Sequence, residues 1–139
     1  MNTNIIVSLI GFMGIGAIIK SLIDAALNKR QNQSAKQHDF KETRYKTTIM
    51  LMLAALDFEN NISSLREHGR NFTTKEQLLD EIKAERNNMI LFASDEVINS
   101  IKQFIGSPTE QTFYQAAIQM RKDLYSLKTK LKPTDLLIR

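Results

Sequence analysis

Three arginines lie next to apolar positions of the chain, and they are the strongest candidates for a functional site. They are Arg44, Arg86 and Arg121, each about one helical turn from an apolar stripe. An isolated charge in a protein core is very costly, so a buried arginine requires a paired carboxylate. The carboxylates available for this are Glu85, Asp95, Glu96 and Asp123. The set favours a structural ion network, with an anion-binding groove and a solvated surface as the two alternatives.

The rest of the sequence offers few residues at the spacing that acid–base catalysis or metal binding requires. Asp95 and Glu96 are adjacent, so on a helix they point about 100° apart, and a solvated charged face is favoured over a catalytic carboxylate pair. The two histidines, His38 and His68, belong to no H-x-x-x-H or E-x-x-H pattern. The chain has no cysteine, which excludes disulfides and thiol nucleophiles. We expect no catalytic residue, no cofactor and no metal site.

The length and composition indicate one folded domain behind an apolar segment. The chain has 139 residues, of which 42% are hydrophobic and 24% charged, and this is a composition that folds. From Ile5 to Ile23 the only charged residue is Lys20, and this length approaches the roughly 20 residues of a membrane-spanning helix. We therefore predict a transmembrane anchor over residues 1–28. A buried core helix and the apolar part of a signal peptide are the alternatives.

Basic residues follow the predicted anchor and indicate its orientation. The first four residues carry no Lys or Arg, which argues against a cleaved signal peptide. The positive-inside rule then predicts a single-pass protein of the cell inner membrane, with its N-terminus outside and its C-terminal domain in the cytoplasm. A basic collar is expected to contact anionic lipid, and it consists of Lys29, Arg30, Lys36 and Lys41.

Small residues recur along the predicted anchor. Small side chains let two transmembrane helices approach closely, so the row favours self-association into a homo-oligomer. The row consists of Ser8, Gly11, Gly14, Gly16 and Ala17.

Helical periodicity predicts an all-α fold, in which the N-terminal transmembrane helix is followed by an antiparallel bundle of three long helices. The helices are expected over residues 40–67, with a kink at 57–61, then 74–105 and 108–127. Residues 29–39 form a polar linker or a continuation of the anchor helix, and 128–139 a basic tail. Thr74 with Gln77 predicts one N-cap, and Ser107-Pro108-Thr109-Glu110 predicts another at Ser107. The last helix is expected to bury Phe113, Ala117, Met120, Leu124 and Leu127.

The formal net charge of +4 is unevenly distributed along the chain. The collar and the tail are basic, whereas residues 47–120 are acidic. The tail cations Lys128, Lys130 and Lys132 are not interleaved with aromatic residues, so nucleic acid is not expected as a partner.

Three segments carry a resemblance to known proteins: Phe40–Lys46, Leu91–Ile98 and Met120–Leu124. They resemble segments of an uncharacterised family of small prokaryotic single-pass membrane proteins with a helical cytoplasmic domain. The resemblance implies this architecture and no activity.

The leading hypothesis is a membrane-anchored cytoplasmic interaction or scaffold protein that self-associates or binds a protein partner. One alternative is a membrane-active effector whose glycine-bearing helix oligomerises and permeabilises the membrane. A third hypothesis is an enzyme or anion-binding module that uses the arginine and carboxylate set.

Overall fold

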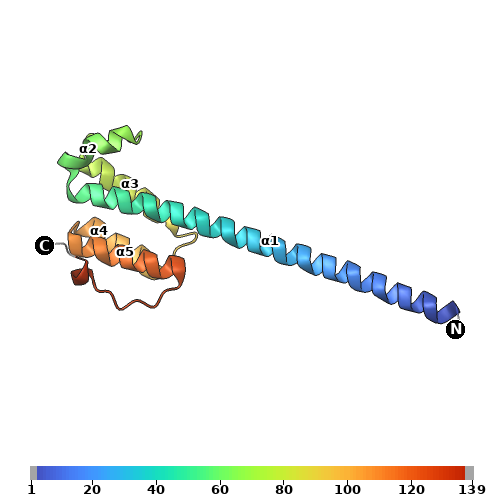
Figure 1. Cartoon of the computed structure of the whole chain (residues 1–139). Coiled ribbons are helices and arrows are strands. Elements are labelled where there is room, and N and C mark those ends of the chain that lie inside the picture. The colour runs from blue at the N-terminus through green and yellow to red at the C-terminus, as the bar shows by residue number, and fades with distance from the viewer. Residues whose placement is uncertain (1–2, 137–139) are drawn as a thin grey trace. The chain divides into compact units, whose positions relative to one another are not determined.

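The structure is a computed structural model that describes the backbone of residues 3–136 and the side chains of residues 19–136. The regular elements of the described residues are all helices, with no strand, which confirms the all-α class (Figure 1). The chain divides after Asp39 into two compact units. The elements are α1 (Thr3–Leu56), α2 (Phe58–Glu67), α3 (Lys75–Met89), α4 (Asp95–Gly106), α5 (Glu110–Tyr125) and the 3₁₀ turn η1 (Pro133–Asp135).

The first unit consists of the N-terminal part of α1. Residues 29–39, expected to be a linker or a continuation of the helix, are helical. Seven of its eleven residues are Gln, Lys, Arg or Ala, which favour a helix, and it contains no Gly or Pro. The side chains of residues 19–37 are exposed on every side of the helix.

The predicted membrane anchor falls largely on residues whose side chains the structure does not describe. Within the part of the chain whose side chains are described, no helix is long and apolar enough to cross a membrane. Residues 5–18 of the predicted span lie outside that part. So does the predicted helix-association row of Ser8, Gly11, Gly14, Gly16 and Ala17.

The second unit, residues 40–139, contains a hydrophobic core to which all five helices contribute. On α1 the inward face carries Tyr45, Thr48, Met52 and Ala55, spaced at three or four residues as on one helical face. Helix α4 packs against both α3 and α5, and η1 lies against α5. The core residues from α2 to α5 are Phe58, Leu65, Leu78, Ile82, Met89, Val97, Ile101, Phe104, Phe113, Ala116 and Met120.

The predicted helix over residues 40–67 is interrupted within the segment where a kink was expected. Helix α1 ends at Leu56, Asp57 leaves the helical conformation with φ −138° and ψ 71°, and α2 begins at Phe58. The Asn60 side chain donates to the Asp57 carboxylate at 2.8 Å, and the Asn61 side chain donates to the Asp57 carbonyl at 2.7 Å. Both contacts join Asp57 to the first turn of α2, where the Asp57 carbonyl also accepts the Asn61 N–H at 3.2 Å. Downstream, Gly69 has a φ of 73°, a left-handed conformation that favours glycine at a helix end.

The prediction of a single helix over residues 74–105 is wrong. Helix α3 starts at the predicted cap, where Thr74 Oγ1 accepts from the Gln77 N–H, but it ends at Met89. Residues 90–93 form turns, and Ser94 caps α4 by accepting from the Val97 N–H. Asp95 and Glu96 then occupy the first turn of α4, where negative charge is favourable. Over residues 40–136 the bundle therefore contains five helices rather than three long ones.

The predicted cap at Ser107 is also wrong, because α5 begins two residues later. Thr109 is the N-cap, and Pro108 lies before the helix. Thr109 Oγ1 accepts from the Thr112 N–H at 3.2 Å, and Thr112 Oγ1 accepts from the Thr109 N–H at 3.1 Å. This reciprocal pair satisfies two N-terminal N–H groups, so it outcompetes the serine.

Candidate functional site

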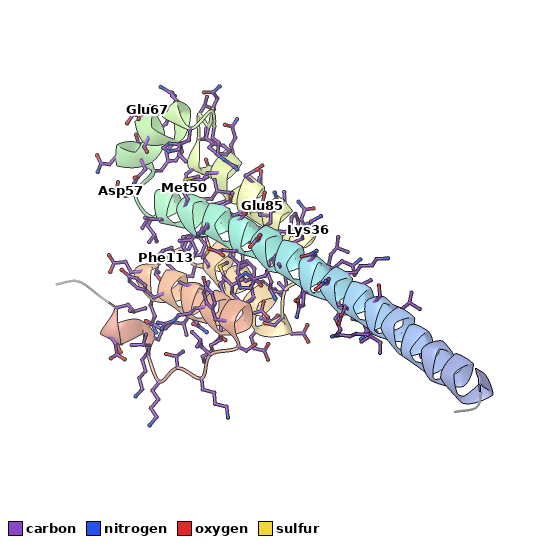
Figure 2. The ribbon with its side chains drawn as sticks, turned by 45° about the vertical axis from the view of Figure 1, so that its right-hand side comes forward. Lys36, Met50, Asp57, Glu67, Glu85 and Phe113 are labelled. Carbon is purple, nitrogen blue, oxygen red and sulfur yellow. The ribbon has the colours of Figure 1, made fainter. Side chains whose placement is uncertain are left out.

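The predicted arginine and carboxylate set is not one network in the structure. Only Arg44 and Glu85 form an ion pair with each other, between α1 and α3, with Arg44 Nη2 2.8 Å from Glu85 Oε2. The Glu85 side chain is 7% exposed and the Arg44 side chain 30% exposed. Figure 2 shows Glu85 on α3 beside α1. Arg44 Nε and Glu85 Oε2 lack aligned hydrogen bonds, so the contact is mainly electrostatic.

The other members of the set lie apart from this pair. Arg86 is half-buried, and its Nε donates to the Ile98 carbonyl of α4 at 3.2 Å. Asp95 and Glu96 are exposed at the start of α4, and Arg121 is exposed on α5. The arrangement therefore provides one buried ion pair, and it does not converge these arginines on a common anion site.

Asp123 joins α5 to α1 through two side chains. It accepts a short hydrogen bond from the Tyr45 hydroxyl, and Lys41 Nζ lies 2.6 Å from its Oδ2. Lys41, predicted to belong to the lipid-facing collar, is therefore half-buried, with its ammonium group against α5. Lys29, Arg30 and Lys36 are exposed on α1.

Burial, with the hydrogen bond and negative charge of Asp123, raises the pKa of Tyr45 well above its ordinary value. The unfolded phenol titrates near pH 10, whereas the folded phenol keeps its proton. The contribution of Tyr45 to the free energy of unfolding is therefore fully present below pH ~10 and falls above it by about 1.4 kcal/mol per pH unit.

Tyr45→Phe is expected to flatten the fall in unfolding free energy between about pH 10 and 11, measured by urea denaturation. Equal slopes in the two proteins would contradict this.

An apolar groove of about 390 Å³ runs between α1 and α5 in the second unit. Its apolar lining includes Tyr45 and Ile49 from α1, and Met120 and Leu124 from α5. Tyr45 and Met120 are buried and form the floor, whereas Ile49 and Leu124 are half-buried and remain accessible. The remaining lining residues are Glu42, Lys46, Ala117, Arg121 and Tyr125.

Charged side chains stand on both walls of the groove. Lys46 Nζ lies 2.6 Å from Glu42 Oε1, and this hydrogen bond raises the pKa of Lys46. The Lys46 side chain is 74% exposed. Arg121 stands on the opposite wall and is also exposed. The groove thus combines an apolar floor with the Lys46–Glu42 ion pair on its α1 wall and the cation of Arg121 on its α5 wall.

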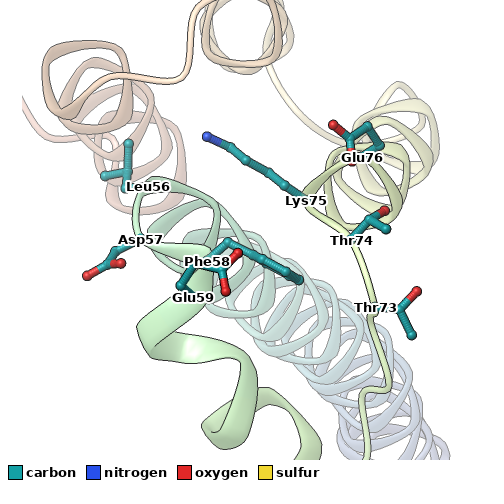
Figure 3. A pocket seen from close by; sticks show the side chains of 8 residues that line it. All are labelled: Leu56, Asp57, Phe58, Glu59, Thr73, Thr74, Lys75 and Glu76. Atoms are coloured by element: carbon teal, nitrogen blue, oxygen red, sulfur yellow. The ribbon is translucent and has the colours of Figure 1, made fainter.

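A second cavity, of about 530 Å³, lies where α1 turns into α2 beside the start of α3. Figure 3 shows Lys75 extending into it, with Asp57, Glu59 and Glu76 around its margin. Its lining is mostly polar and carries three acidic residues against one lysine, so it favours neither an apolar ligand nor an anion. The smaller α1–α5 groove is therefore the better candidate site.

Part of the groove was misassigned from the sequence. The apolar stripe predicted on the last helix combines buried residues with half-buried groove residues: Phe113 and Met120 are buried, Met120 in the groove floor, whereas Ala117 and Leu124 are half-buried in the groove lining. Figure 2 marks Phe113 on α5. Leu127 lies beyond the helix and is 42% exposed. The spacing shows an apolar face, but not which of its residues another helix covers.

Comparisons with protein-family models, with curated proteins and with solved structures find no match for the chain.

Proposed function

We propose that the protein is a membrane-anchored helical interaction module whose α1–α5 groove receives a helix of another protein. The observation that carries this proposal is the spacing of the residues on the two walls. On α1 they are residues 42, 45, 46 and 49, and on α5 residues 117, 120, 121, 124 and 125. Both sets follow the i, i+3, i+4, i+7 pattern by which one helix meets another.

The residue types of the groove also favour a protein partner. Tyr, Met and Arg are enriched at protein interfaces, and Tyr and Arg carry much of the binding energy there. The groove contains Tyr45, Tyr125, Met120 and Arg121. Tyr125 is 51% exposed, so a partner helix would remove further apolar surface from water, at about 25 cal/mol per Å².

Membrane anchoring is supported by the uncharged run of residues 5–19 and by the exposed helix that follows it. Ile19, Leu22, Ile23 and Leu27 are each at least half exposed on α1. Apolar side chains in these numbers favour a lipid or protein surface around the helix. The exposed cations Lys29, Arg30 and Lys36 would then lie near anionic headgroups.

Alkaline carbonate washing of membranes from cells that express the full chain tests the anchor. The native chain is expected to stay in the pellet. Leu9→Lys with Ile15→Lys is expected to release most of it, because each charge near the centre of a span costs about 3 kcal/mol. The matched control adds the same charges to the exposed part of α1, as Gln31→Lys with Gln37→Lys, and should stay in the pellet. Release of the native chain would refute the anchor.

A further inference from the structure

We propose that the α1–α5 groove selects an amphipathic helix that carries acidic residues beside its apolar stripe. This inference rests on the proposed function and names the chemistry of the partner. It follows from the length of the groove walls and from the charges on their edges.

The groove walls fit about two turns of a partner helix. On α1 the lining extends from Glu42 to Ile49, and on α5 from Ala117 to Tyr125. At 1.5 Å per residue these stretches are about 10–12 Å long. A partner helix of this length can present apolar side chains at i, i+3 and i+7 along the groove.

The charges beside this floor favour carboxylates on the partner. Glu42 is already within 2.6 Å of Lys46, so it does not offset Arg121. Among the described residues, Arg121 makes no ion pair and no side-chain hydrogen bond. A guanidinium group binds a carboxylate through two parallel hydrogen bonds, and next to an apolar floor that contact is partly shielded from water.

The same charges disfavour a second copy of the chain as the occupant. A second copy offers Arg121 no unpaired carboxylate in its own groove, because Glu42 is within 2.6 Å of Lys46. A basic amphipathic helix would be repelled by Arg121.

Photo-crosslinking of the full chain in its native membranes tests this inference. Benzoylphenylalanine replaces Leu124 in the groove, or, as a control, the exposed Lys102 on α4. After irradiation, the crosslinked peptides are sequenced by mass spectrometry. The expected adduct forms only from position 124, on a segment with helically spaced apolar residues flanked by Asp or Glu.

Charge reversal at the groove edge completes the test. Arg121→Glu is expected to reduce the yield of this adduct at least tenfold, Arg121→Lys should retain part of it, and Lys102→Glu should leave it unchanged. The melting temperature of Arg121→Glu should match that of the native chain, because Arg121 is exposed.

The outcomes separate the inference from the proposed function. An adduct with a second copy, or with a protein helix that lacks acidic residues, would overturn the inference and leave helix docking intact. If Arg121→Glu does not change the adduct yield, the acidic selectivity is likewise overturned and helix docking is left intact. A lipid adduct, or no adduct specific to position 124, would overturn both.

Discussion

Replacing Arg44 by methionine is expected to lower the free energy of unfolding by about 3–5 kcal/mol, because it leaves a buried carboxylate without its cation. Glu85 is the residue left behind, and its side chain is only 7% exposed. The reverse change, Glu85→Met, leaves Arg44, which is 30% exposed and can turn toward water. We therefore expect Glu85→Met to cost less, about 1–3 kcal/mol. The measurement is urea denaturation of the full chain in detergent, followed by far-UV circular dichroism.

The double variant Arg44→Met with Glu85→Met tests whether the loss of stability comes from the unpaired carboxylate. Apolar residues of similar size often replace a buried ion pair without loss, so its stability should return to within about 1 kcal/mol of the native value. The matched control is the more exposed pair of Arg70 and Glu81, at 3.4 Å, where Arg70→Met should cost about 0–1 kcal/mol. A purely structural role for the pair is refuted if Arg44→Met costs no more than Arg70→Met, or if the double variant is as unstable as Arg44→Met alone.

The pair also illustrates which parts of the structure the sequence could predict. Apolar residues at helical spacing and the N-cap at Thr74 were sufficient to predict an all-helical chain, because each of these signals involves only residues that are close together in the sequence. The partner of Arg44 was not predictable in this way. Four carboxylates were candidates, and the choice of Glu85 depends on how α3 lies against α1. That contact joins residues far apart in the sequence.

The break between α3 and α4 was missed for a different reason. Met89 or Ile90, followed by Ala93, continues the apolar spacing of Leu79 and Ile82, so periodicity alone extends the helix through residues 90–93. The local signal was Ser94 followed by Asp95 and Glu96, a cap with negative charge in the first turn. The groove was missed because Ala117 and Leu124 share the spacing of the core residues. Only the packing of α5 against its neighbours separates the two sets.

Phe104→Ala is expected to destabilise the second unit by about 3–5 kcal/mol, through lost apolar burial and the cavity that remains. Phe104 is among the largest side chains with no exposed surface, and it belongs to the core to which all five helices contribute. Its matched control is Leu91→Ala. Leu91 belongs to the same predicted helix of residues 74–105, but it is 89% exposed in the turn before α4. That change should cost less than about 0.5 kcal/mol.

The same denaturation experiment compares the two alanine variants, with Phe104→Leu as an intermediate that keeps most of the buried volume. We expect unfolding free energies in the order native, Phe104→Leu, Phe104→Ala, with Leu91→Ala close to native. If residues 74–105 formed one straight helix, Ile90 would lie on the core stripe that contains Val97, Ile101 and Phe104, and its truncation would be costly as well. Ile90 is instead 63% exposed, so Ile90→Ala should cost little, and a loss comparable with that at Phe104 would argue against the break at residues 90–94.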